Sequence, residues 1–149
     1  MDPLSQGAFG AIFAQTISNK KKLIAGSILG CLAGLAPDLD VLIRSNLDPL
    51  LKLEFHRQFT HSLVFIPIGA LIVTLFTRMF FKKYLSWKQS YLFCLFGYAT
   101  HGLLDACTSY GTQLLWPFSN ERISILQLYP ILQSALEITN QEPLGEIES

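Results

Sequence analysis

Long stretches without charged side chains limit how this chain folds more than any other feature of its sequence. Leu23–Pro37 carries no charge, and Ser62–Phe81 is interrupted only by Arg78 near its end. Pro3–Asn19 and Gln89–Leu104 also lack lysine, arginine, aspartate and glutamate. A helix that crosses a bilayer needs about 20 mostly apolar residues, and tilt or local thinning of the bilayer accommodates shorter spans. The runs therefore predict helices that cross a membrane.

The composition supports a membrane domain and argues against a nucleic-acid surface. Half of the 149 residues are hydrophobic and 15% are charged, whereas about a quarter are charged in soluble domains. The formal net charge is zero, and binding to nucleic acid needs a basic face. We predict an all-α integral membrane bundle of four to five helices over residues 1–138, with a polar, flexible tail over 139–149. A soluble all-α domain with buried helices is the alternative.

Small residues recur within the second uncharged run. Gly26, Gly30 and Gly34 are spaced four residues apart, so they share one face of a helix. Small residues at this spacing let helix backbones approach closely within membranes. We expect this helix to be packed tightly against a neighbour.

The basic residues predict how the chain crosses the membrane. Lys20–Lys22 and the group from Arg78 to Lys88 lie at ends of apolar runs, and positive residues mark the cytoplasmic side. Leu23–Pro37 then leads outward and Ser62–Phe81 leads back. The polar stretch 38–61 and the end of the last run therefore meet at one extracytoplasmic face.

That last run ends in a histidine and an aspartate that are suited to sharing a metal. His101 and Asp105 are four residues apart and lie on one helix face. An isolated pair with this spacing is more simply explained as a capping or hydrogen-bonded pair. Here the pair follows an apolar run, where ionisable groups are costly without partners. We therefore expect further polar groups to meet them.

The polar groups expected at the same face include every histidine of the chain. They are Asp38, Asp40, His56, His61, His101 and Asp105. Zinc takes three or four nitrogen and oxygen ligands and keeps one position for water in a catalytic site. His61, His101 and Asp105 are the predicted ligands, joined by Asp40 or Asp38. We assign Asp40 to the metal and keep Asp38 and His56 as candidate catalytic bases. The metal is a divalent ion, zinc first, with manganese and magnesium as alternatives.

Neighbouring residues have simpler interpretations that stay open. Asp38 alone also suits a cap of the turn after Pro37. Arg57 is a candidate for binding an anionic substrate, or an anchor at the membrane surface. Hydroxyls beside the predicted ligands are candidates for orienting them, on residues Thr60, Ser62 and Thr100.

Several blocks of the sequence resemble a known family. The blocks are Asp2-Pro3-Leu4-Ser5-Gln6-Gly7, Pro37-Asp38-Leu39-Asp40, His56-Arg57-Gln58-Phe59-Thr60-His61-Ser62, His101-Gly102-Leu103-Leu104-Asp105 and Trp116-Pro117-Phe118-Ser119. In this order they resemble the bacterial membrane-bound metal-dependent hydrolases of the YdjM type. The resemblance implies a mostly helical protein of the inner membrane that hydrolyses its substrate with a bound metal. This family is itself distantly similar to zinc-dependent phospholipases C, which implies that the substrate is a phosphoester, such as a lipid head group.

The chain departs from this family pattern at two places. Gln6, a poorer metal ligand, stands where some relatives have histidine, and Leu128-Tyr129-Pro130 stands where fuller relatives continue into further helices. We therefore expect a truncated or diverged member. The predicted function is hydrolysis of an ester or phosphoester beside the bilayer in the bacterial inner membrane, with a lipid as a candidate substrate. The alternative is a non-enzymatic multi-pass membrane protein with a structural or regulatory metal.

Overall fold

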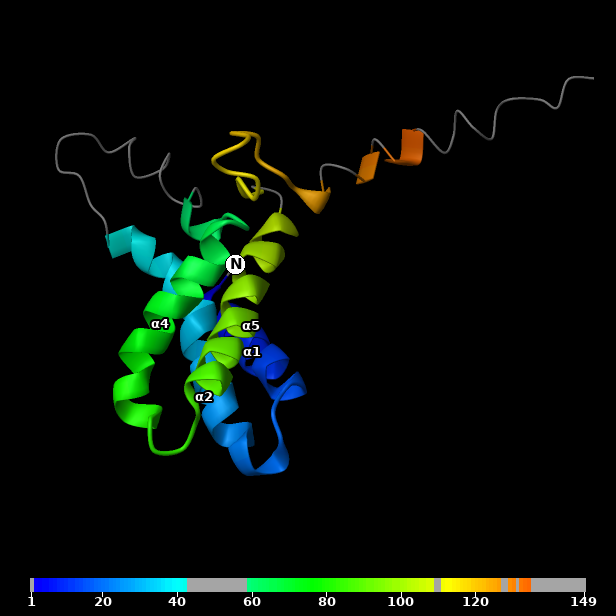
Figure 1. Ribbon diagram of the computed structural model, residues 1–149. Coiled ribbons are helices and arrows are strands. Elements are labelled where there is room, and N and C mark those ends of the chain that lie inside the picture. Colours follow the sequence, from blue (N-terminus) through cyan, green and yellow to red (C-terminus); the bar gives the residue numbers. More distant parts are fainter. Residues whose placement is uncertain (1, 43–58, 109–110, 127–128, 131, 135–149) are drawn as a thin grey trace, which may run out of the picture.

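A computed structural model describes residues 2–42, 59–108, 111–126, 129–130 and 132–134 (Figure 1). Its α-helices are α1 (Pro3–Thr16), α2 (Leu23–Leu35), α4 (Phe65–Phe81) and α5 (Trp87–Ala106). Short 3₁₀ segments precede and follow them, namely η1 (Lys20–Lys22), η2 (Ala36–Leu42) and η3 (Phe59–His61). The only β-type pairing among the described residues is an isolated bridge between Thr112 and Ile123. The all-helical prediction is confirmed for this part of the chain, whereas the predicted tail lies outside it.

Local sequence explains where two of the helices begin. The Asp2 carboxylate accepts the N–H of Ser5 at 2.9 Å, and Pro3 occupies the first turn of α1, where a missing N–H costs nothing. Hydrogen bonding to Ser5 lowers the pKa of the Asp2 carboxyl. At the start of α5, Ser86 and Gln89 form a reciprocal capping box.

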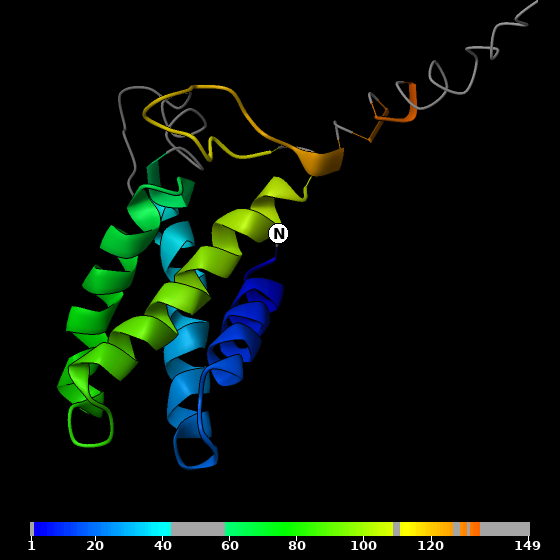
Figure 2. The same cartoon turned by 45° about the vertical axis from the view of Figure 1, so that its right-hand side comes forward.

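The four helices run alternately up and down, so their connections sort to two ends of the bundle. The turn from α1 to α2, with Lys20–Lys22, and the turn from α4 to α5, with Lys82 and Lys83, lie at the same end (Figures 1 and 2). The start of α1, η2, η3 and the end of α5 lie at the opposite end (Figure 2). The acidic and histidine-bearing segments are thus separated from both groups of lysines.

Three of the helices meet through glycine backbones. A Cβ added at Gly30 of α2 would collide with the carbonyl oxygen of Gly10 on α1, and one added at Gly97 of α5 would collide with that of Gly30. Gly34 likewise leaves room for the Gln6 backbone. The close approach predicted from the glycine spacing is confirmed, and it joins α1, α2 and α5.

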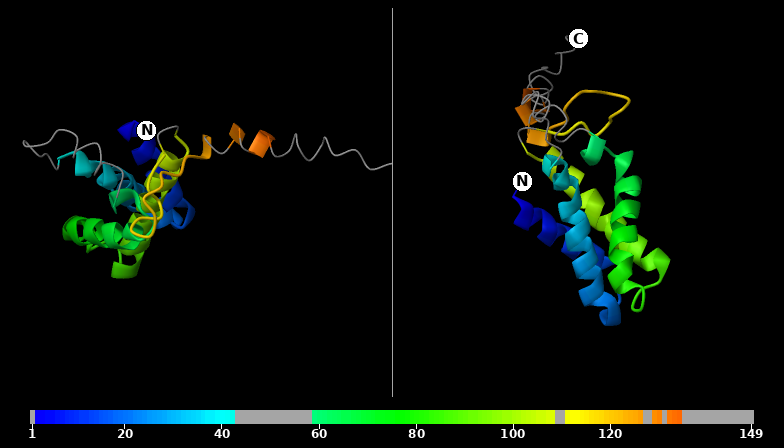
Figure 3. Two further views of the ribbon diagram at one scale, coloured as in Figure 1. Left: turned by 90° about the horizontal axis from the view of Figure 1, so that it is seen from above. Right: turned by 90° about the vertical axis from the view of Figure 1, so that its left-hand side faces the viewer.

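The remaining helix, α4, stands at the side of the bundle away from α1 (Figure 3). It packs along α5 and contacts α2 less extensively. Its buried Ala70 joins Leu29, Phe93 and Cys94 in the core, while its outer face leaves large apolar side chains exposed, such as Phe76 at 79%.

By length and apolar character, one described helical stretch qualifies as a membrane span. This stretch is Lys20–Leu39, and Phe65–Phe81 is apolar but shorter.

Candidate metal centre

The last two turns of α5 carry two ionisable side chains into the protein interior. The side chains of His101 and Asp105 are both 0% exposed, and His101 Nε2 lies 3.8 Å from Asp105 Oδ2. They share one helix face, as their spacing predicted.

A second histidine reaches this pair from η3. His61 Nε2 lies 2.8 Å from His101 Nε2 and 3.3 Å from Asp105 Oδ2, and its side chain is fully buried. Two contacts hold η3 and its junction with α4 in place: Tyr98 of α5 donates its hydroxyl to the Thr60 carbonyl at 2.9 Å, and the Leu63 N–H donates to the Leu114 carbonyl at 2.9 Å. His61 is therefore positioned by its neighbours on both sides.

The fourth group comes from η2, directly after α2. Asp38 Oδ1 lies 3.4 Å from His101 Nε2 and 3.9 Å from His61 Nε2. Its side chain is 25% exposed, while those of the two histidines and Asp105 are 0% exposed. We call Asp38, His61, His101 and Asp105 the acid–histidine cluster; Asp38 forms its open side.

The donor atoms of the cluster fit a small divalent cation. One ligand atom from each of the four residues lies within 4.8 Å of all the others. A tetrahedral zinc ion with bonds of about 2.0 Å places its ligand atoms about 3.3 Å apart. The five histidine-to-partner distances range from 2.8 to 3.9 Å around that value. Two imidazole nitrogens and two carboxylate oxygens are also a donor set that zinc accepts.

Hydrogen bonds outside the cluster determine which histidine nitrogen faces it. His101 Nδ1 lies 2.6 Å from the Gly34 carbonyl, which only accepts, so Nδ1 carries a proton; in the neutral imidazole, Nε2 then presents its lone pair to the cluster. His61 Nδ1 lies 2.9 Å from Thr60 Oγ1, which is able to play either role. A backbone carbonyl behind a histidine ligand is a common way to orient it toward a metal.

Gln6 of α1 contacts the cluster from behind. Its side chain is 0% exposed, and its Nε2 donates to Asp105 Oδ1 at 3.1 Å. Asp105 Oδ2 faces the histidines, so the amide holds one carboxylate oxygen while the other is presented to the cluster. From the sequence alone, Gln6 is expected only to be a poorer metal ligand than histidine. Its spacing with Gly10 and Ala14, all buried on one face of α1, is the signal that indicates its inward position.

The remaining predicted site residues either lie outside the described part of the chain or make contacts near the cluster. The side chain of Asp40, and all of His56 and Arg57, lie outside the described residues. Among the hydroxyls expected to orient ligands, that of Thr60 contacts His61. Those of Ser62 and Thr100 donate to backbone carbonyls of Phe59 and Gly97.

Comparison with known proteins places the sequence among bacterial membrane proteins. The sequence model of a family described as "YdjM inner membrane protein" matches residues 1–139. The chain is 37% identical over 102 residues to "Inner membrane protein YbcI" of Escherichia coli (strain K12), covering 67% of this chain and 56% of that protein. It is 26% identical over 90 residues to "Uncharacterized protein YfhP" of Bacillus subtilis (strain 168), covering 60% of this chain and 27% of that protein. The alignments thus span less than two thirds of either relative, and no solved structure matches.

Proposed function

Since this chain belongs to the YdjM inner membrane protein family, we propose that it is a multi-pass membrane hydrolase whose acid–histidine cluster holds a divalent metal, zinc first. One observation carries the proposal: two buried imidazole Nε2 atoms 2.8 Å apart face the carboxylates of Asp38 and Asp105. Four such groups in a buried site are costly unless a cation or shared protons balance them.

Surface chemistry supports the membrane part of the proposal. Phe76, Met79 and Phe80 of α4 are 79%, 73% and 68% exposed, and soluble monomers rarely show contiguous apolar patches of this kind. At a rise of about 1.5 Å per residue, α5 is about 30 Å long and α4 about 26 Å, close to the thickness of a bilayer core. With the lysine turns on the cytoplasmic side, the cluster faces the extracytoplasmic side.

The residues of the cluster divide into two roles by their exposure. His61, His101 and Asp105 are buried and would hold the metal; Asp38 lies at the open side, where it accepts a proton from an incoming water. A metal held by these residues would act as a Lewis acid and would lower the pKa of water at the site toward neutrality. In the hydrolysis, the water oxygen joins the carbonyl carbon or phosphorus, the bond to the alcohol oxygen breaks, and Asp38 returns the proton to that oxygen. The roles predicted for Asp40, His56 and Arg57 stay predictions.

A structural metal is the second candidate function. The cluster joins η2, η3 and α5, three segments distant in sequence, at one end of the bundle. If Asp38 is a fourth ligand, the site is closed and serves to hold these segments together, as structural zinc sites do.

The deciding experiment measures metal content and hydrolysis in the same preparations. The full chain is purified in detergent, incubated with zinc, manganese or magnesium, and analysed by mass spectrometry for metal, beside His101→Ala and the exposed control Cys107→Ala. Hydrolysis of para-nitrophenyl acetate and bis-para-nitrophenyl phosphate is followed for these proteins and for Asp38→Asn. We expect metal in the wild type and in Cys107→Ala, its loss in His101→Ala with helicity kept, and loss of hydrolysis but not of metal in Asp38→Asn.

Two results would contradict the proposed hydrolase function. Absence of metal from the wild type under all three incubations removes the basis of both candidate functions. Loss of metal in Asp38→Asn, with no hydrolysis by the wild type, favours the structural metal.

A further inference from the structure

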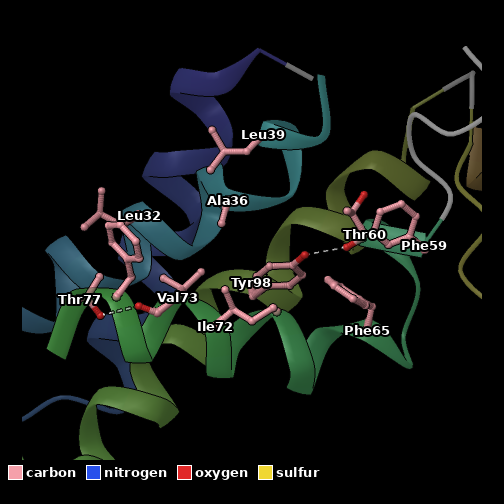
Figure 4. Close-up of a pocket in the computed structure, with 12 residues that line it drawn as sticks. Leu32, Ala36, Leu39, Phe59, Thr60, Phe65, Ile72, Val73, Thr77 and Tyr98 are labelled. Carbon is pink, nitrogen blue, oxygen red and sulfur yellow. Dashed lines mark hydrogen bonds between the residues drawn. The ribbon is translucent and has the colours of Figure 1, made fainter. Parts of the chain in front are cut away.

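An apolar cleft separates α4 from α2 (Figure 4). Its volume is about 480 Å³, which lies within the range of small-molecule sites. Leu32 and Ala36 line one wall, Ile72 and Val73 line the other, and Tyr98 of α5 lies between them. The cleft exists because α4 packs along α5 and makes few contacts with α2.

The hydroxyl groups of the cleft already have partners within the protein. Thr77 donates to the Val73 carbonyl at 2.8 Å, and Tyr98 donates to the Thr60 carbonyl at 2.9 Å (Figure 4). The Thr60 hydroxyl lies 2.9 Å from His61 Nδ1. A polar ligand would give up its hydration for apolar walls, which is costly, whereas a hydrocarbon chain needs no hydrogen bond. The lining therefore selects an apolar occupant.

One side of the cleft is continuous with the exposed apolar face of α4. Ile72 and Phe76 line the cleft and are also 54% and 79% exposed. Met79, one turn beyond the cleft, continues the same surface at 73% exposure. In a protein of the inner membrane, acyl chains of the bilayer are the apolar molecules that meet such a surface.

One end of the cleft adjoins the acid–histidine cluster. Leu39 and Thr60 line the cleft, and the residues next to them in the chain are Asp38 and His61. The contact between Tyr98 and Thr60 marks this end in Figure 4. An amphiphile with its tail in the cleft therefore has its polar part beside the cluster.

We propose that the cleft binds one acyl chain of a bilayer phospholipid, and that this phospholipid is the substrate of the cluster. The assignment of this phospholipid as the substrate rests on the proposed hydrolase function. The binding of its acyl chain in the cleft does not. The tail lies between α2 and α4, and the ester groups of the lipid lie at the end formed by η2 and η3. Hydrolysis adds water across one of those ester bonds, as described above.

The test is photochemical labelling of the full chain in vesicles of 1-palmitoyl-2-oleoyl-phosphatidylglycerol. The vesicles contain a phosphatidylglycerol analogue with a diazirine in the middle of one acyl chain. After illumination, peptide mass spectrometry locates the labelled residues, and metal content is measured on the same samples. We expect several-fold more label on cleft residues, such as Leu32 and Val73, than on Leu75, which is 59% exposed and outside the cleft.

Two matched variants on α4 separate cleft binding from general contact with lipid. Val73→Trp fills the cleft and should lower labelling of Leu32 several-fold, while Leu75→Trp adds the same indole to the outer face and should leave it unchanged. Ala36→Leu, a smaller obstruction from the start of η2, serves if Val73→Trp fails to fold. Equal labelling of all exposed apolar residues, or no change in any cleft variant, overturns the inference.

The measurement distinguishes failure of this inference from failure of the proposed function. Metal in the wild type without enriched label in the cleft keeps the metal centre and removes the lipid site. Enriched label in a protein that takes up no metal supports the lipid site and overturns its assignment as a substrate site.

Discussion

The two sides of α2 differ in how they meet their neighbours. On one side, Gly30 lets the backbones of α1 and α5 contact that of α2, and Gly34 does the same for α1. On the other side, Leu32 and the adjoining Ala36 of η2 face α4 across an apolar cleft. We call the first the glycine seam and the second the open seam. The glycine seam aligns the groups behind the cluster, whereas the open seam leaves space beside it, so one helix combines a rigid support with a candidate binding site.

The glycine seam orients the cluster through two polar contacts. The Gly34 carbonyl accepts from His101 Nδ1, and Gln6, packed against Gly34, donates to Asp105 Oδ1. The first contact requires α2 to lie close to α5, and the second requires α1 to lie close to α5. Substitutions at this seam should therefore affect the proposed metal binding as well as the fold. Substitutions at the open seam should affect the proposed lipid binding more than the fold.

The largest expected effect on stability is that of a bulky side chain introduced at the glycine seam. Gly30→Leu places a side chain where the Gly10 carbonyl and the Ala14 methyl lie, and no flexible group is there to give way. We expect a loss of at least about 3 kcal/mol in the free energy of unfolding, the upper end of overpacking effects. Thermal unfolding followed by circular dichroism in detergent measures it. Ala36→Leu at the open seam is the matched control, and equal destabilisation by the two would erase the distinction between the seams.

Removal of the proposed metal should have the next largest effect on stability. A ligand that binds only the folded state stabilises it by about 4 kcal/mol when it is present at 1,000 times its dissociation constant. We expect a chelator to lower the melting temperature of the wild type and zinc to restore it. His61→Ala should show no response to either addition. A wild type whose melting temperature is insensitive to chelator and to added metal contradicts this expectation.

Gln6→Leu should weaken the metal site through Asp105. The substitution leaves a buried carboxylate oxygen without the donor that now faces it, which costs about 1–3 kcal/mol in stability. Loss of a group that orients a ligand typically lowers metal affinity about 10- to 100-fold. Competition with a chromogenic chelator measures the affinity. Gln15→Leu is the control, because Gln15 also lies on α1 but donates to Ser27, away from the cluster. Unchanged affinity in Gln6→Leu would show that the amide serves packing alone.

The smallest expected effect on stability is at the N-terminal end of α5, which lies beside the turn that carries Lys82 and Lys83. Ser86→Ala removes the side chain that accepts from the Gln89 N–H and should cost about 1 kcal/mol in stability. Because this cap lies at the opposite end of the bundle from the cluster, metal affinity should stay at its wild-type value. Thermal unfolding and the same chelator competition test both statements; a drop in affinity would mean that the cluster is sensitive to any loosening of α5.

Sequence patterns were sufficient for the elements and for part of the candidate site. Each uncharged run contains most of one described α-helix, because apolar helices of this length are readable from local composition. The spacing of His101 and Asp105 was enough to place them on one face, since helix geometry is local. The family blocks also indicated the membership that the comparison then showed.

Only the tertiary structure decided what surrounds these residues. Gln6 and Asp105 are 99 positions apart, and Gly34 and His101 are 67 positions apart, so no local pattern relates them. The packing of the helices determines three further features. It gives His101 a backbone carbonyl as its partner, places Asp38 at the open side of the cluster, and leaves the cleft beside α4. Local periodicity determines which face of a helix is apolar; the distance between two such faces depends on the whole bundle.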